Sequence, residues 1–315
     1  MATVDTPRSI TRSAPSSASL AASHKLVGRL GPWQLVRLLA EGNLTRVYQA
    51  RPAESQAGES GNGESSWRPA AYAIKLLRNE WWRDPAAIEL QRREAWVGTR
   101  VSHPNLLPVL SASVQQPPFY LVTPKLDGTD LAQVIASQGR LGVPLALWIA
   151  RQIADGLAAL YDATSMIHAD VKPANILISP TGHATLIDFG FVQTPAEARN
   201  WSNRPVVGTL AYIAPEMVTS AIAADPHCDI YSLGVTLYEM LAGRRPFESE
   251  DPGELAMQQR EVKPADVREH RPDAPDEVAV LLTSMLAKDP LRRPDSAREL
   301  AARLVRLEID SFTLR

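Results

Sequence analysis

The sequence predicts an α+β fold in which a strand-rich first part of about 100 residues is followed by a mostly helical second part. Two observations support this prediction. In the first part, apolar and polar residues alternate in short runs separated by Gly, Pro and Ser, as in strands joined by turns. From Pro144 onward, apolar residues recur every three or four positions, as on one face of a helix.

Length and charge limit the classes of function. A chain of 315 residues can form one large two-lobed domain or two domains of ordinary size. The formal net charge of -2 gives no electrostatic reason to expect binding to nucleic acid or to an anionic membrane. No apolar run approaches the roughly 20 residues that cross a bilayer, and the start lacks the apolar stretch of a secretory signal. We therefore expect a cytoplasmic protein without a nucleic-acid or membrane partner.

The ends of the chain and its cysteine carry little chemistry. Residues 1–28 are rich in Ser and Ala, and we expect a disordered tail there, with a transit peptide as the weaker alternative. Residues 309–315 are expected to form a C-terminal tail. The single cysteine, Cys228, excludes an intrachain disulfide and suits a reducing compartment. Because it lies beside Asp229 at the start of an apolar helix, a buried inert thiol is predicted.

The elements of the first part follow in order. Residues 31–42 and 45–50 alternate around a turn and predict a hairpin. Segment 52–69 is rich in Gly, Ser and Glu, has nothing to bury, and predicts a flexible insertion. The pair Trp81-Trp82 favours buried packing over an exposed partner surface. Further elements are predicted as a strand over 70–77, a helix over 85–101, and strands over 106–114 and 118–126.

The second part has the helical period. Pro144 suits the first turn of a helix, and the apolar positions that follow lie on one face. These positions are Leu145, Ile149, Ile153, Leu157 and Leu160. Residues 229–243 predict a strongly apolar helix that ends near Gly243. Ser296 and Glu299 have the spacing of a capping box ahead of a last helix.

One short loop concentrates polar side chains that phosphoryl transfer requires. Within "HADVKPAN", Asp170 offers a carboxylate, Lys172 a cation and Asn175 an amide oxygen. A carboxylate can orient a substrate hydroxyl and accept its proton. Asn175 and Asp188 supply hard oxygen donors that suit Mg²⁺. Lys75, at the end of a predicted strand, can hold phosphate oxygens if an acid such as Glu94 pairs with it.

Each fragment alone is a weak signal, but their order and spacing resemble the protein kinase family, and in particular the bacterial Ser/Thr kinases of eukaryotic type. The resemblance runs from about Trp33 to Leu307. It implies a bilobal fold with a kinase domain over 29–308, divided into an N-lobe over 29–124 and a C-lobe over 125–308. It also implies that Mg²⁺-ATP is bound between the lobes and that the γ-phosphate is transferred to Ser or Thr of protein substrates.

The resemblance implies a role for each matching residue. Asp170 and Lys172 match the catalytic residues, and Asn175 and Asp188 match the metal ligands. Lys75 matches the phosphate-binding lysine, with Glu94 as its partner and Glu89 as a less favoured alternative. The remaining positions that match the ATP site are Ala40, Gly42, Val47, Ala73, Thr123, Pro124, Leu126 and Leu177.

Other matches have structural roles in the family. Glu216 is expected to pair with Arg293, and Asp229 to anchor the catalytic loop from beneath. Thr209 is expected near the catalytic acid. Lys172 and Thr209 are typical of kinases that act on peptides, which disfavours a small-molecule phosphotransferase on the same fold.

Two departures from the family pattern bear on function. The glycine-rich loop appears as "AEGNLTRV", with Ala40 and Thr45 where glycines are usual, so weaker nucleotide binding is expected. This degraded loop motivates the alternative function of a pseudokinase or nucleotide-binding scaffold. Ala169 stands where most regulated kinases carry an arginine that binds a phosphorylated activation loop. Phosphorylation of Thr194 or Ser202 is therefore not expected to be the on-switch, and control is expected from a regulatory protein partner or the N-terminal tail.

Overall fold

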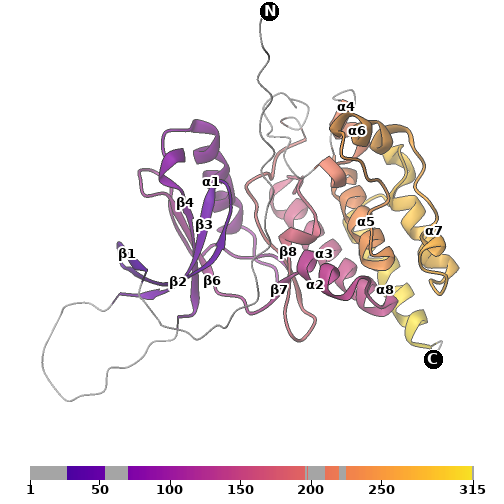
Figure 1. The fold of residues 1–315 in the computed structure, drawn as a ribbon, viewed down its shortest axis with the longest axis horizontal. Helices are drawn as coiled ribbons and strands as arrows, with labels where there is room; N and C mark the ends of the chain where they lie inside the picture. The colour runs from indigo at the N-terminus through magenta and orange to yellow at the C-terminus, as the bar shows by residue number, and fades with distance from the viewer. Residues whose placement is uncertain (1–26, 54–69, 196, 198–209, 220–224, 314–315) are drawn as a thin grey trace, which may run out of the picture.

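The computed structural model describes residues 27–53, 70–195, 197, 210–219 and 225–313. They form two lobes, with a strand-rich N-lobe on the left of Figure 1 and a helical C-lobe on the right. The predicted α+β, bilobal architecture is confirmed. The insertion predicted over 52–69 lies outside the described residues from 54 onward, and most of the predicted N-terminal tail does so as well.

The N-lobe is built on a six-stranded antiparallel sheet with the order β1-β2-β3-β4-β6-β5. Its strands are β1 (Gly28–Leu30), β2 (Trp33–Glu41), β3 (Thr45–Pro52), β4 (Tyr72–Leu77), β5 (Ser111–Ser113) and β6 (Tyr120–Pro124). The predicted hairpin is β2–β3, and the Gly42 amide donates to the Thr45 carbonyl across its turn at 2.8 Å. The strand predicted over 106–114 is shorter than expected, because Leu106 pairs with Leu186 of the C-lobe and only 111–113 join β6.

Helix α1 (Pro85–Gly98) packs beside this sheet, after the short 3₁₀ turn η1 (Asn79–Trp81). The Asp84 carboxylate accepts from the Ala87 amide at 2.8 Å and caps the start of the helix. Thr99, whose hydroxyl donates to the Ala95 carbonyl at 2.7 Å, follows the last helical residue. The helix therefore stops three residues before the predicted limit of Val101.

The tryptophan pair is packed rather than displayed as a surface patch. Trp81 and Trp82 are half-buried and lie against a cluster that contains Leu77 and Phe119. Their indole N–H groups donate to the Asn43 and Leu77 carbonyls, both at 3.0 Å. Each indole thus packs its ring against apolar side chains and keeps the hydrogen bond of its N–H group. The packing prediction is therefore confirmed.

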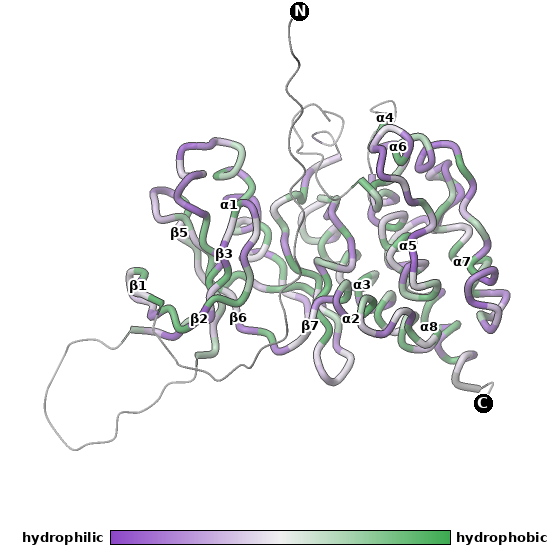
Figure 2. Tube along the Cα trace, in the orientation of Figure 1, coloured by the Kyte–Doolittle hydropathy of each residue, from purple (hydrophilic) through white to green (hydrophobic). Residues whose placement is uncertain are grey.

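The C-lobe surrounds helix α3. Its helices are α2 (Leu131–Gln138), α3 (Val143–Thr164), α4 (Pro215–Thr219), α5 (His227–Ala242), α6 (Pro252–Glu261), α7 (Asp276–Met285) and α8 (Ala297–Thr313). The 3₁₀ turns are η2 (Pro173–Asn175), η5 (Leu210–Tyr212), η6 (Val267–Glu269) and η7 (Pro290–Arg292). A small antiparallel sheet joins β7 (Thr129–Asp130), β8 (Ile176–Ile178) and β9 (Ala184–Leu186) beside them. Hydrophobic and hydrophilic residues alternate along these helices, as expected when one face of each is buried (Figure 2).

Helix α3 is the central core helix. It is 22 residues long and apolar enough to pass a length-and-composition test for a membrane span, contrary to the expectation that no run approaches that length. Within the fold, 61% of its apolar window is buried. Ile149, Ile153 and Leu160 are fully buried. Leu145 was expected on this face but is 38% exposed, although Val143 and Ala146 beside it in the same turn are buried, so Leu145 lies outside the buried face of α3.

The last helix corrects the predicted C-terminal tail. Helix α8 continues to Thr313, five residues past the expected boundary. Glu308 is buried there and accepts from the Arg151 Nε of α3 at 2.8 Å, which holds this part of the helix against the core. The capping box at its start is present, since the Glu299 amide donates to the Ser296 hydroxyl at 3.1 Å. The Glu299 carboxylate reaches back to the amide of Asp295 instead of Ser296.

Candidate active site

Lys75 of β4 lies between two acids. Its Nζ is 2.7 Å from Oε2 of Glu94 on α1 and 3.0 Å from Oδ1 of Asp188. Gln91, one turn before Glu94, donates its side-chain amide to the Lys75 carbonyl at 3.0 Å and joins the helix to the strand. Glu89 is exposed and faces Arg93 at 3.6 Å instead. The predicted partner Glu94 is therefore the one that pairs with Lys75.

Burial and charge act against each other in this cluster. Burial raises the pKa of Glu94 to about 7, and the neighbouring Asp188 carboxylate adds to that rise while Lys75 opposes it. Burial also disfavours the charged form of Lys75, but the two acids more than reverse this, so its pKa lies above its usual value. Burial disfavours the charged form of Asp188 too, yet Lys75 leaves its pKa below the usual range. The ammonium is therefore charged at neutral pH.

The loop 168–175 presents its polar side chains to one another. Asp170 is buried, and its two carboxylate oxygens lie 2.8 and 3.0 Å from Nζ of Lys172. Asn175, in η2, donates its amide nitrogen to the Asp170 carbonyl at 2.9 Å and to its Oδ2 at 2.8 Å. The amide nitrogen is thus committed to Asp170, which identifies the oxygen as the atom of Asn175 available to a cation.

Asp229, in the first turn of α5, holds this loop from beneath. Its two carboxylate oxygens accept from the backbone amides of His168 at 2.7 Å and Ala169 at 2.8 Å. Ala169 has a φ of +62°, in the left-handed region that non-glycine residues rarely adopt. Hydrogen bonds from a buried carboxylate offset the cost of that conformation. The predicted anchoring contact is therefore present.

Asp188 and Asn175 are adjacent through the backbone. The Ile187 amide, next to Asp188, donates to the Asn175 carbonyl at 2.9 Å. Phe189 is buried and packs edge-on against the His168 ring, with centroids 5.7 Å apart, so Asp188 stays on the Lys75 side. An amide oxygen and a carboxylate form a hard donor set that fits Mg²⁺, which usually takes one or two protein ligands and completes its shell with water and phosphate. Within the described residues, no cluster of three or more His, Cys, Asp or Glu could hold a metal on its own.

These groups line one cavity of about 480 Å³ between the lobes. Gly42 and Thr45 contribute to it from the β2–β3 turn, and Lys75 and Glu94 contribute from the N-lobe interior. Asp170, Lys172 and Asp188 contribute from the C-lobe side. The cavity thus collects the predicted catalytic, metal and phosphate-binding residues except Asn175.

The other predicted ATP-site residues lie in register across the sheet. Ala40 pairs with Val47, and Val47 pairs with Lys75. Ala73 lies two residues before Lys75 on the same face of β4 and pairs with the buried Thr123 of β6. The remaining three are half-buried: Pro124 at the end of β6, Leu126 just after it and Leu177 in β8.

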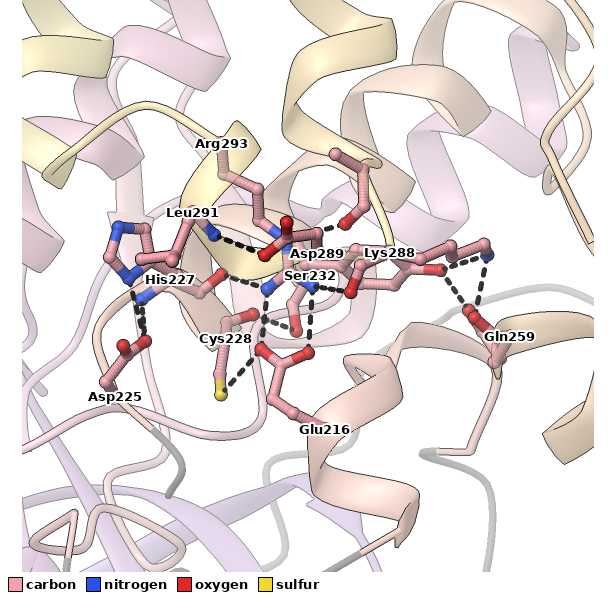
Figure 3. Close-up of polar contacts among 12 residues, drawn as sticks. Glu216, Asp225, His227, Cys228, Ser232, Gln259, Lys288, Asp289, Leu291 and Arg293 are labelled. Carbon is pink, nitrogen blue, oxygen red and sulfur yellow. Dashed lines mark hydrogen bonds and ion pairs between the residues drawn. The ribbon is translucent and has the colours of Figure 1, made fainter. Parts of the chain in front are cut away.

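A second polar cluster lies deep in the C-lobe (Figure 3). The Arg293 guanidinium donates to both carboxylate oxygens of Glu216, at 2.6 and 2.8 Å, and both side chains are essentially inaccessible. Arg293 also donates to the backbone carbonyls of Ala287 and His227, at 2.8 and 3.0 Å. The predicted pairing is confirmed. Cys228 is buried and donates to Glu216 at 3.2 Å, and burial raises the pKa of its thiol, as expected of an inert cysteine.

Several contacts at the site were not anticipated from sequence. Gln91 and Arg93 of α1 also join that helix to its surroundings, through hydrogen bonds to the Lys75 and Val192 carbonyls. Thr194 is half-buried and exchanges hydrogen bonds with Glu197. The spacing Thr194-x-x-Glu197 is that of a capping box and is the signal that could have revealed this contact. Ser202 and Thr209 lie outside the described residues.

A cleft between a strand-rich and a helical lobe, with an ion-paired lysine above and a carboxylate loop below, is the arrangement that phosphoryl transfer by kinases requires. The protein kinase domain model matches residues 36–304, and the chain belongs to the protein kinase family.

Bacterial relatives are similar over most of the chain. This chain is 28% identical to the serine/threonine-protein kinase PrkC of Bacillus subtilis over 86% of the chain's own length. It is 33% identical to the serine/threonine-protein kinase PknA of Mycobacterium tuberculosis over 84% of the chain's own length. It is 31% identical to the serine/threonine-protein kinase PknH of Mycobacterium bovis over 86%. The chain spans 40%, 58% and 43% of the lengths of these three relatives.

Proposed function

We propose that this protein is an active protein serine/threonine kinase that transfers the γ-phosphate of ATP to Ser or Thr hydroxyls of protein substrates. One observation carries the proposal: Lys75 contacts Glu94 and Asp188 at the same time, at 2.7 and 3.0 Å. Kinase catalysis requires both the lysine–helix ion pair and the metal-binding aspartate to be in place. The names of the relatives and the intact Asp170 loop support the same conclusion.

Asp170 is proposed to orient the substrate hydroxyl and to accept its proton as the bond to phosphorus forms. Its carboxylate is fixed by Asn175 and Lys172, so it needs no reorganisation when a hydroxyl arrives. Lys172, 2.8 Å from that carboxylate, is placed to balance negative charge on the group in transfer. Lys75 is proposed to hold the α- and β-phosphates, with Glu94 aiming its ammonium.

Asn175 and Asp188 are proposed to hold Mg²⁺, which neutralises phosphate charge when it is bound. The adenine ring is proposed to lie with Ala40 of β2 and Val47 of β3 on one side and the side chain of Leu177 on the other. Ala73 would lie next to the ring. The backbone around Thr123, Pro124 and Leu126 would bind its edge. We further propose a cytoplasmic location and a regulatory protein partner, because Ala169 cannot bind a phosphorylated loop.

The decisive test is transfer of labelled γ-phosphate to a generic basic protein in the presence of Mg²⁺. Wild-type protein should label the acceptor, and Asp170→Asn should not. An equal background signal from both proteins would instead support a pseudokinase that serves as a scaffold. Nucleotide binding, followed with a fluorescent ATP analogue, separates a scaffold that binds ATP from one that does not.

The altered glycine-rich loop gives a quantitative prediction. The double variant Ala40→Gly, Thr45→Gly should bind ATP about three- to tenfold more tightly, because backbone can approach phosphate more closely without side chains. Isothermal titration calorimetry in the presence of Mg²⁺ measures the change.

Adenosine serves as the control for this variant, since it lacks phosphates. The affinity of the double variant for adenosine should equal that of wild type or be slightly lower, because glycine weakens the strand that begins at Thr45. Equal gains for ATP and adenosine would show that these two positions do not act on the phosphates.

A further inference from the structure

Arg93 connects helix α1 to the segment that follows Asp188-Phe189-Gly190. Its Nη1 donates to the backbone carbonyl of Val192 at 3.0 Å. Its Nη2 donates to Oε1 of Glu197 at 3.0 Å, and Nη1 lies 3.5 Å from the second oxygen of that carboxylate. This is the forked geometry in which arginine binds a carboxylate or a phosphate with both nitrogens. Arg93 directly precedes Glu94, so whatever holds Arg93 also limits where Glu94 can move.

Thr194 orients the Glu197 carboxylate independently of Arg93. Its Oε2 accepts from the Thr194 amide at 2.9 Å and from the Thr194 hydroxyl at 3.1 Å. Its own amide lies 3.3 Å from the Thr194 hydroxyl, so the two residues bind each other reciprocally. Partial burial disfavours the charged form of Glu197, but Thr194 and Arg93 outweigh it and lower its pKa. The carboxylate is therefore ionised and oriented at neutral pH.

The segment that carries these groups is also joined to the catalytic loop. Gln193, between Val192 and Thr194, exchanges two backbone hydrogen bonds with Ile167, at 2.9 and 3.0 Å. Ile167 lies three residues before Asp170. A single guanidinium thus links the helix of Glu94 to a stretch of chain that is continuous with Asp188 and paired to the Asp170 loop.

Arg93 also has a second acid within reach on its own helix. Glu89 lies one turn earlier, with its carboxylate 3.6 Å from Nη2 of Arg93. That side chain is 56% exposed, so its contact with Arg93 is weak. If the segment around Glu197 moved away, Arg93 would still have Glu89 as a partner. Helix α1 would then no longer be joined to the activation segment, which is the stretch of chain that begins at Asp188 and includes Glu197.

We propose that Arg93 and Glu197 are positioning residues, and that the Glu197 carboxylate fixes α1 against the start of the activation segment in the way a phosphate does in kinases activated by phosphorylation. This inference rests on the proposed kinase function. It accounts for a site that is assembled although Ala169 offers no cation to a phosphate. Glu197 replaces a modification with a permanent charge, so assembly of the site requires no upstream kinase.

The test compares Arg93→Ala, Glu197→Gln and the charge-swapped double variant Arg93→Glu, Glu197→Arg with wild type. Each single variant should lower kcat about tenfold through a shift in the population of the assembled site, with the KM for the protein substrate nearly unchanged. The swapped variant should recover part of the lost kcat, since the ion pair is restored in reverse while the hydrogen bonds of residue 93 to Val192 and of residue 197 to Thr194 are not. Phosphatase treatment of wild type should leave kcat unchanged.

Arg303→Ala is the control, because Arg303 pairs with Glu299 at 2.7 Å within α8 and this arginine–glutamate pair does not join α1 to another segment. It should behave as wild type. Hydrogen–deuterium exchange of the α1 peptide gives a readout that needs no turnover and should rise in Arg93→Ala and Glu197→Gln only.

These measurements separate the two proposals. A wild type without phosphotransfer would overturn the kinase function, while exchange in α1 would still report on the contact. Exchange and kcat equal to the Arg303→Ala control in both single variants would overturn the positioning role. Loss of kcat on phosphatase treatment would overturn the claim that Glu197 stands in for a phosphate. If the swapped variant does not fold, Glu197→Gln decides by the same criteria.

Discussion

Replacement of Asp170 by asparagine is expected to lower kcat at least about a hundredfold, and up to about ten-thousandfold, because a positioned general base contributes on that scale. Asparagine preserves the size of the side chain, and its carbonyl oxygen can still accept from the Asn175 amide that Asp170 Oδ2 now binds at 2.8 Å. What disappears is the negative charge that accepts the proton from the substrate hydroxyl and pairs with Lys172 at 2.8 Å.

The loss should be confined to the chemical step. We expect ATP affinity within about threefold of wild type and a small change in Tm, because Asp170 contacts neither Lys75 nor the sheet. Single-turnover transfer of labelled phosphate measures the effect, with differential scanning fluorimetry as the check on folding. Retention of more than a tenth of wild-type kcat in a correctly folded variant would rule out Asp170 as the base.

Substitution Arg293→Ala is expected to lower the free energy of unfolding by about 3 to 5 kcal/mol, because it removes the guanidinium that balances the charge of the buried Glu216 carboxylate. Glu216 is 3% exposed and Arg293 is 3% exposed, so water cannot take the place of the lost contact (Figure 3). The substitution also removes donors from three backbone carbonyls, those of Ala287, His227 and Lys288. Urea unfolding followed by tryptophan fluorescence measures the change.

The adjacent Arg292 supplies a matched control. Its side chain is 81% exposed and lies 3.8 Å from Asp289, so Arg292→Ala should change stability by less than about 0.5 kcal/mol. The double variant Arg293→Ala, Glu216→Ala should lose less than the sum of the single variants, because no unpaired charge remains. A loss below about 1 kcal/mol for Arg293→Ala would contradict the account of a desolvated ion pair.

Much of the site could be predicted because its parts are local. Asp170, Lys172 and Asn175 lie within six residues, and a loop that short brings them together in most conformations it can adopt. The cap of α8 by Ser296 and the placement of Pro144 in the first turn of α3 follow from backbone groups left unpaired at helix starts. The β2–β3 hairpin follows from alternation around a Gly-containing turn.

Other predictions were wrong because they depended on neighbours that are distant in the chain. Leu145 has the spacing of the buried face of α3, yet the helices that pack on α3 cover Ala146 and Leu147 and leave Leu145 exposed. The chain over 309–313 reads as a tail, but the contact of Glu308 with Arg151, 157 residues away, keeps α8 helical there. The apolar run from Leu106 reads as a strand, while a bridge to Leu186 draws its start into the C-lobe.

The sequence by itself determined the bilobal α+β architecture, the order of the catalytic elements and the identity of Asp170, Asn175, Lys75 and Asp188 as the residues to examine. The α+β pattern follows from periodicity and the grouping of Asp170 with Asn175 from short spacing, whereas the bilobal arrangement and the roles of Lys75 and Asp188 follow from the resemblance of the ordered motifs to the kinase family. Only the tertiary structure decided that Lys75 pairs with Glu94 and not Glu89, and that Arg93 meets Glu197 across 104 residues of sequence. Such contacts depend on how α1 packs against a segment of the other lobe. That packing cannot be predicted from the pattern of apolar residues in either segment.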